Sequence, residues 1–186
     1  MIKISALLAA GVLAFTALGA KAAIFTTAFE QVGGDVVATG SGAFDLTGMT
    51  RMGGPIPEEN RVWSSLGFFL FGVGSSDAYD LSMSGPGVFG TGGQFLATSR
   101  AGDQLGIWTL EDRIYVPVGY VSGAALSNSA TWAGQTLAGL GLVDGTYSYT
   151  FGNNTYNVVV GSVPEPASMA LLAFGLAGLG FLRRRK

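Results

Sequence analysis

The sequence contains no cysteine and no histidine among its 186 residues. Without cysteine the chain has no disulfide bond, no zinc–thiolate site and no thiol nucleophile. Without histidine it lacks the side chain that most often serves as general base or transition-metal ligand, and a Ser-His-Asp triad is impossible. These absences remove the commonest catalytic classes, so we expect that the protein is not an enzyme and needs no cofactor.

Charge is also scarce, at 12% of residues against about 25% in average soluble domains. Six of the ten basic residues lie near the two ends of the chain. Between residues 23 and 161 there is no lysine, and four arginines against eleven acids leave a net charge of −7. An acidic body of this kind argues against nucleic acid or an anionic membrane surface as the partner.

The first 22 residues have the pattern of a secretory signal peptide. Lys3 supplies a short positive region, an uncharged apolar run follows to residue 20, and small residues flank Lys21. We predict a signal-peptide helix over residues 1–22, with cleavage by signal peptidase between Ala22 and Ala23 and with Gly19 or Ala20 as alternative ends of the signal peptide. An uncleaved anchor helix is the alternative, although the run is short for a span of about 20 residues.

The C-terminal segment, residues 162–186, has three parts in a fixed order. A Val163-Pro164-Glu165-Pro166 break comes first, and then an uncharged apolar stretch over residues 167–182. Four basic residues end the chain: Arg183, Arg184, Arg185 and Lys186. We predict a C-terminal transmembrane helix in the inner membrane. The basic tail stays cytoplasmic by the positive-inside rule, and the body faces the periplasm.

These three parts resemble a PEP-CTERM sorting signal. The resemblance implies recognition by an exosortase, a membrane enzyme that cleaves or transfers the chain near Pro164-Glu165-Pro166. The destination is then the outer surface or the extracellular matrix of bacteria that make exopolysaccharide. Short segments at residues 38–42, 115–123 and 140–147 resemble sequences that recur in one group of such proteins, which has no assigned activity. A simple retained membrane anchor is the alternative.

Between the two ends, residues 23–161 show short apolar or alternating runs separated by glycine, asparagine, aspartate and proline. This pattern predicts an all-β fold, a single antiparallel β-sandwich or jelly-roll-like domain. The stretch 52–60 is expected to be an exposed loop, and the apolar run 68–71 a buried central strand. The expected strands are 24–31, 35–39, 43–46, 68–73, 79–83, 94–98, 105–110, 113–118, 120–126, 147–151 and 156–160.

Few residues in the body suggest chemistry. Asp77 and Asp80 are candidate calcium ligands, because calcium prefers carboxylate and carbonyl oxygens, but solvated turn aspartates are the simpler interpretation. The three tryptophans could stack on sugars or pack in the core. A hydrolase needs two convergent carboxylates, and no spacing singles out a pair. The available acids are Glu30, Glu58, Glu59, Glu111 and Asp112.

The sequence therefore predicts an exported structural protein of the cell surface or of an exopolysaccharide or biofilm matrix. A glycan- or calcium-binding surface module is the first alternative, and a carboxylate-dependent hydrolase the second. Expected partners are signal peptidase and exosortase during export, the inner membrane through the C-terminal helix, and exopolysaccharide, but not nucleic acid.

Overall fold

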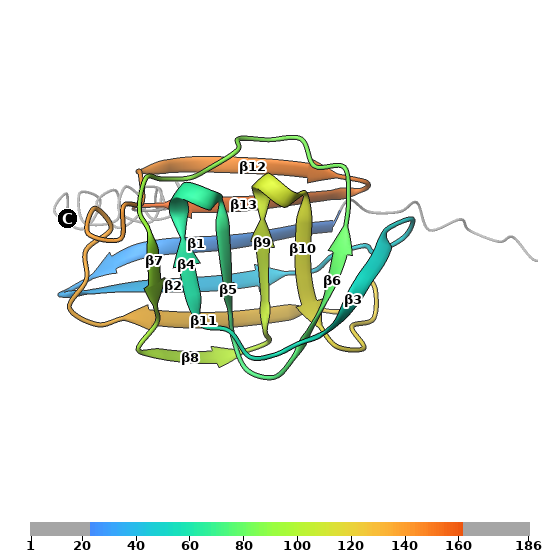
Figure 1. Ribbon diagram of the computed structural model, residues 1–186, viewed down its shortest axis with the longest axis horizontal. Coiled ribbons are helices and arrows are strands. Elements are labelled where there is room, and N and C mark those ends of the chain that lie inside the picture. The colour runs from blue at the N-terminus through green and yellow to red at the C-terminus, as the bar shows by residue number, and fades with distance from the viewer. Residues whose placement is uncertain (1–22, 162–186) are drawn as a thin grey trace, which may run out of the picture.

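The computed structural model describes residues 23–161, which form thirteen β-strands and two short 3₁₀ helices (Figure 1). Both helices are single turns that reverse the chain between neighbouring strands of one sheet. The elements are β1 (Ala23–Val32), β2 (Asp35–Gly42), β3 (Thr50–Ile56), β4 (Arg61–Trp63), η1 (Ser64–Leu66), β5 (Phe68–Phe71), β6 (Ser76–Asp80), β7 (Gln94–Leu96), β8 (Ser99–Gly102), β9 (Leu105–Trp108), η2 (Thr109–Glu111), β10 (Arg113–Pro117), β11 (Leu126–Trp132), β12 (Gly145–Phe151) and β13 (Asn154–Val160).

The strands form two sheets packed face to face, which confirms the predicted β-sandwich. Sheet A has six strands in the order β12-β13-β1-β2-β11-β8. Sheet B has seven, in the order β3-β6-β10-β9-β5-β4-β7. In Figure 1 the strands of sheet B run across those of sheet A.

Sheet A brings the two ends of the described chain together. Its first strand, β1, pairs with its last strand, β13, in parallel, whereas the other pairings between named strands are antiparallel. Ala23 lies opposite Asn154 at one end of this pair, and Phe29 lies opposite Val160 at the other. Residues 23 and 161 therefore leave the sandwich at opposite ends.

The core fills the space between the sheets and is rich in aromatic rings. Inward residues alternate with outward ones, as the two-residue period of a strand requires. Phe29 of sheet A, for example, packs edge to face on Phe69 of sheet B at 5.4 Å between ring centroids. The largest fully buried side chains are Trp132, Tyr149, Tyr156, Phe25, Phe29, Phe44, Phe69, Phe71, Phe89, Leu70, Leu105 and Ile107.

Most expected strands are present, including the final hairpin of β12 and β13. Segment 68–71 is a central strand as predicted, with Phe69, Leu70 and Phe71 buried, but Phe68 is half-buried on the outer face. The alternation of a strand explains this, because Phe68 and Leu70 share the face opposite to Phe69 and Phe71.

Other expectations were wrong. The stretch 52–60 is not all loop, because β3 forms an edge strand with two register shifts that accommodate its glycines and Pro55. Segment 43–46 is not a strand, and in segment 120–126 only Leu126 belongs to one, as the first residue of β11. They lie in loops held together by the Tyr120 hydroxyl, which accepts from the Phe44 amide at 2.9 Å. Strands β4, β8 and β11 were not expected, and β6 begins three residues before its expected start.

The predicted signal-peptide helix and C-terminal transmembrane helix lie outside the described residues. Within residues 23–161, none of the helices has the length and apolarity that a membrane span requires.

Candidate aromatic groove on sheet B

The outer faces of the two sheets differ in chemistry. Sheet A presents short polar side chains in register across its strands, and the row formed by Ser148, Asn157, Thr26, Ser41 and Ser127 crosses five of them. Sheet B presents large aromatic rings on its outer face instead. An apolar face of rings exposed to solvent marks a binding surface more strongly than a face of small polar groups.

Three rings on neighbouring strands of sheet B form a continuous row. Trp63 of β4 pairs with Phe68 of β5, and Phe68 pairs with Trp108 of β9. All three side chains are partly exposed. Gln94 of β7 continues the row at one end, and Arg113 of β10 followed by Asp80 of β6 continues it at the other. We call Trp63, Phe68 and Trp108 the aromatic row.

A second row runs beside the first and leaves room for a hollow. It passes from Arg61 to Leu70, Gly106 and Tyr115. Gly106 has no side chain, and an added Cβ there would collide with the Phe69 carbonyl, so the close approach of β5 requires glycine at this position. The second row is therefore lower than the aromatic row at its centre.

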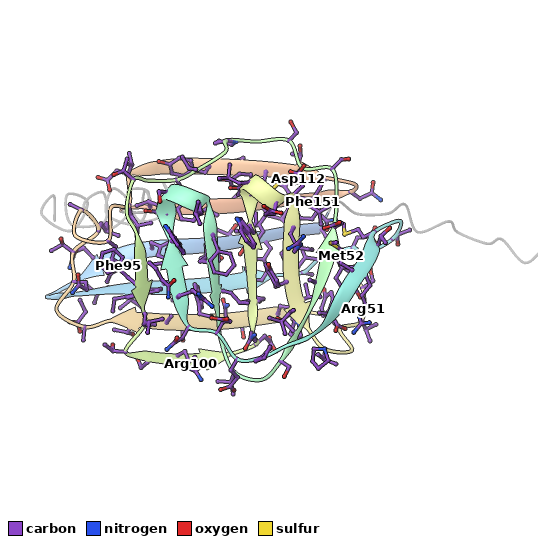
Figure 2. The ribbon with its side chains drawn as sticks, viewed as in Figure 1. Arg51, Met52, Phe95, Arg100, Asp112 and Phe151 are labelled. Atoms are coloured by element: carbon purple, nitrogen blue, oxygen red, sulfur yellow. The ribbon has the colours of Figure 1, made fainter. Side chains whose placement is uncertain are left out.

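A pocket of about 300 Å³ occupies this hollow, and we call it the aromatic groove. Ile56, the last residue of β3, and Glu59, in the segment between β3 and β4, also line it. Figure 2 shows Arg51 on β3 and Phe95 on β7 towards the two edges of the sheet, and the strands lining the groove lie between these edges. The lining residues are Ile56, Glu59, Arg61, Trp63, Leu66, Phe68, Leu70, Trp108 and Tyr115.

The rings of the groove hold one another in fixed orientations. Phe68 meets Trp108 edge to face at 5.4 Å and Tyr115 at 6.1 Å between ring centroids. Leu70 and Tyr115, beneath them, are only 1% and 5% exposed. Burial raises the pKa of the Tyr115 hydroxyl, so this group stays protonated at neutral pH. The floor of the groove is thus packed before any ligand arrives.

Charged groups at the rim are matched in pairs. Arg61 donates to both carboxylate oxygens of Glu59, with Nε–Oε2 at 2.6 Å, and its guanidinium lies 5.9 Å from the Phe68 ring centroid. The hydrogen bond with Glu59 raises the pKa of Arg61. At the other end Arg113 lies 5.8 Å from the Trp108 ring centroid and donates to Asp80 at 3.3 Å. Each arginine therefore sits over a ring with its charge already paired.

This combination of features suits a ligand with apolar faces and polar edges. Aromatic rings have negative faces, which attract the slightly positive C–H groups of a stacked partner. Pockets for small ligands are typically apolar with a few well-placed polar groups. A sugar ring has this composition, with C–H groups on its faces and hydroxyl groups around its edge.

The carboxylates do not form a catalytic pair in this groove. Glu59 is the carboxylate among its described lining residues, and Arg61 engages both of its oxygens. Glu58 instead bonds the Gly74 amide at 2.7 Å and Arg100 of sheet A at 2.6 Å. Two-carboxylate hydrolysis has no support from this arrangement.

The calcium candidates are separated by the strand they share. Asp77 and Asp80 are both in β6, three residues apart, so their side chains point to opposite faces. Asp77 is buried and pairs with Arg51 at 2.6 Å, while Asp80 pairs with Arg113. Within residues 23–161 no three acidic side chains gather in a way that could hold a metal ion.

The three tryptophans have different roles, which the sequence did not separate. Trp63 and Trp108 line the groove, whereas Trp132 is 1% exposed and lies in the core. Tyr115, Phe68 and Arg61 were missed as groove residues. Their shared face could have been recognised from the alternation in Arg61-Val62-Trp63 and in the run 68–71.

The predicted sorting residues, and Ala22 before the predicted cleavage point, lie outside residues 23–161. These sorting residues are Val163, Pro164, Glu165, Pro166 and the basic residues Arg183, Arg184, Arg185 and Lys186. Ala23, on the other side of the predicted cleavage point, is the first residue of β1, and its amide donates to the Asn153 carbonyl at 3.0 Å.

Comparison with known proteins finds a match for the C-terminal segment of the chain. No curated protein and no solved structure matches the chain. Residues 162–186 match the family described as the PEP-CTERM protein-sorting motif. The match covers the segment that contains the Pro-Glu-Pro break, the apolar stretch and the basic tail. Residues 162–186 thus carry a PEP-CTERM sorting motif, which indicates an exported protein that is anchored in a membrane and then processed by an exosortase.

Proposed function

We propose that the mature body is a non-catalytic protein of the outer cell surface or extracellular matrix that holds polysaccharide in the aromatic groove. The single observation that carries this proposal is the aromatic row beside a preformed pocket. The proposal combines a structural role in an exopolysaccharide or biofilm matrix with glycan binding. The glycan-binding module is favoured over a purely structural protein, because partly exposed tryptophans gathered on one surface mark a site of interaction.

The test uses the exopolysaccharide of the cells that make the protein. The body, residues 23–161, migrates through native gels with and without this polysaccharide in the matrix. We expect retardation of the wild type, and its loss when Trp63 and Trp108 are both replaced by alanine. Val121→Ala is the matched control, because Val121 is 71% exposed and does not line the groove. Equal migration with and without polysaccharide contradicts the proposal.

We propose that export follows the route predicted from the two ends of the chain. Signal peptidase cleaves before Ala23, the C-terminal helix holds the precursor in the inner membrane with the body in the periplasm, and exosortase then releases or transfers the body. Intact-mass spectrometry of the protein from fractionated cells tests this route. A surface-located product that still carries Arg183–Lys186 shows that the tail is a permanent anchor instead.

A further inference from the structure

The ion pairs of the groove bear on which kind of glycan it takes. Glu59 engages Arg61 through both carboxylate oxygens, and Gln94 accepts from a further nitrogen of the same guanidinium at 3.3 Å. At the other end of the aromatic row, Arg113 is shared between Asp80 and Met52. An anionic ligand would have to break one of these pairs and leave a carboxylate without its partner, which is unfavourable.

The rest of the body also disfavours anionic ligands. Each of the four arginines between residues 23 and 161 is in an ion pair: Arg51 with Asp77, Arg61 with Glu59, Arg100 with Glu58 and Arg113 with Asp80. The surplus of acids, which gives this part of the chain its net charge of −7, therefore has no compensating cation. A polyanion approaching this surface meets net repulsion.

The aromatic row sets the direction of the ligand. Its three rings stand on adjacent strands, so Trp63 and Trp108 are about 10 Å apart across the sheet. Hydrogen-bonding groups lie at both ends of the row, with Gln94 at one and Arg113 with Asp80 at the other. A short sugar chain along the row can stack on the rings and direct its hydroxyl groups to both ends.

We infer that the aromatic groove binds an uncharged polysaccharide, whose chain lies across the strands along Trp63, Phe68 and Trp108. This inference rests on the proposed glycan-binding function and narrows it to neutral sugars. An acidic polysaccharide is the competing ligand within that function. An apolar peptide or a second copy of the body is the competing occupant outside it.

The experiment measures binding of the body to defined polysaccharides. The neutral probes are laminarin and dextran, and the anionic probes are alginate and hyaluronate, each tested by calorimetry at low and moderate salt. We expect binding to at least one neutral probe and none to the anionic probes. Trp63→Ala and Trp108→Ala should each weaken neutral binding by at least about tenfold, as expected for a central aromatic contact, while Val121→Ala leaves it unchanged.

A second measurement needs no variant and so does not depend on the folding of one. Trp63 and Trp108 are partly exposed and Trp132 is buried. Acrylamide quenching of tryptophan fluorescence should therefore decrease when a neutral polysaccharide covers the row. Undiminished quenching at saturating polysaccharide places the ligand elsewhere and overturns both the inference and the proposed function.

Glu59→Gln gives the sharpest control on charge. The substitution keeps the shape of the side chain but leaves the charge of Arg61 uncompensated. We expect this variant to gain measurable affinity for alginate, and an affinity for alginate equal to that of the wild type would contradict the part that the paired charge plays in excluding anionic ligands.

The outcomes separate the two levels of the proposal. Binding of wild-type protein to alginate that is lost in Trp63→Ala and Trp108→Ala overturns the neutral-sugar inference and leaves the glycan-binding function standing. Absence of all polysaccharide binding, or concentration-dependent dimerisation that Trp108→Ala abolishes, overturns both.

Discussion

Trp132 and Trp108 have the same side chain in different surroundings. Trp132 packs between Phe29 and Phe71, at 5.9 and 6.0 Å between ring centroids, and its indole N–H donates to the Phe95 carbonyl at 3.2 Å. Trp108 lies on the outer face of sheet B, against Phe68 and beneath Arg113. One ring fills the core and the other lines the groove.

Replacing each tryptophan by alanine should separate these roles. Trp132→Ala leaves a cavity between the sheets and should lower the free energy of unfolding by about 3–5 kcal/mol. Trp108→Ala should cost less than about 2 kcal/mol, because part of its surface is already in water. Urea denaturation measures both. A larger loss for Trp108→Ala than for Trp132→Ala would contradict the assignment of Trp108 to a binding surface.

The carboxylate of Asp45 accepts hydrogen bonds from several loops at one end of the sandwich. Its carboxylate accepts from the Thr47 amide at 3.0 Å, the Ser122 hydroxyl at 3.0 Å and the Asn153 side chain at 3.3 Å. The hydrogen bonds from Thr47 come first among the contacts that hold the pKa of Asp45 well below its ordinary value of 3.8, followed by those from Asn153 and Ser122. The carboxylate therefore stabilises the folded state in its charged form.

The lowered pKa of Asp45 sets the direction of its pH dependence. Because the folded pKa lies below the unfolded one, its stabilising contribution is fully present above about pH 4 and is lost as the pH falls below it. Asp45→Asn should lower the melting temperature at pH 7, and its difference from wild type should shrink on acidification below about pH 4. Thermal denaturation from pH 7 to pH 2 measures this. A difference that stays constant shows that the carboxylate charge makes no contribution.

Strands β1 and β13 are joined by a buried side-chain hydrogen bond in addition to their backbone pairing. The Thr27 and Tyr156 hydroxyl oxygens lie 2.9 Å apart, and both residues are fully buried. Each hydroxyl is the side-chain hydrogen-bond partner of the other, and buried polar groups need such partners. Removal of either one leaves the other without a partner.

A double-mutant cycle tests this link between the strands. Tyr156→Phe should cost about 1–3 kcal/mol, because the Thr27 hydroxyl becomes buried and unsatisfied. Thr27→Val should cost a similar amount, and the double variant should be more stable than the sum of the single losses predicts. Urea denaturation of the four proteins gives the coupling energy. Strict additivity would show that the hydrogen bond contributes nothing.

Strands were predictable where large apolar residues alternate, and were missed where they do not. The final hairpin shows the alternation clearly, with Tyr149 and Phe151 of β12 and Tyr156, Val158 and Val160 of β13 all buried. In β11 the inward positions include Asn128 and Ala130, so the apolar period is weak. Asn128 can be buried because its side-chain amide donates a hydrogen bond to the Phe71 carbonyl at 3.0 Å. Only the folded chain brings this partner close.

The groove was predictable in part for the same reason. Tryptophans were recognised as sugar-stacking candidates, but residue type alone did not tell Trp108 from Trp132. The distinction depends on which face of its strand each ring occupies. Strands β4, β5 and β9 come together only through sheet pairing, so the row of Trp63, Phe68 and Trp108 is a tertiary feature.

The last strand of the body, β13, completes sheet A by joining β12 to β1. Strand β13 lies between β12 and β1 in sheet A and contributes Tyr156, Val158 and Val160 to the core. No other described strand pairs with the same side of β1. Contacts between the first and last strands are the most non-local in the sequence, so the fold is complete only when the whole body has been made.

Truncation tests this dependence on the last strand. A chain of residues 23–152 lacks β13, and we expect it not to fold, because β12 loses its strand partner and β1 loses one of its two neighbours. The matched control, residues 23–161, retains all thirteen strands and should unfold in one cooperative transition. Circular dichroism and tryptophan fluorescence during urea titration measure both. A cooperative transition in the shorter chain would show that β13 is dispensable.

The sequence by itself indicated export and determined the fold class of this protein. Sorting signals are read as linear segments, so the order of Pro-Glu-Pro, apolar stretch and basic tail was enough, and the family match at residues 162–186 agrees with it. Alternating runs were likewise enough to predict a β-sandwich. Only the tertiary structure decided which side chains share a surface. Pairing of β4, β5, β9 and β10 in register places three rings beside a hollow that includes Gly106, and it sends Trp132 into the core. The physical reason is that sheet pairing brings together residues that are far apart in the chain. Which strands pair, and in which register, cannot be read from the distance between their residues in the sequence.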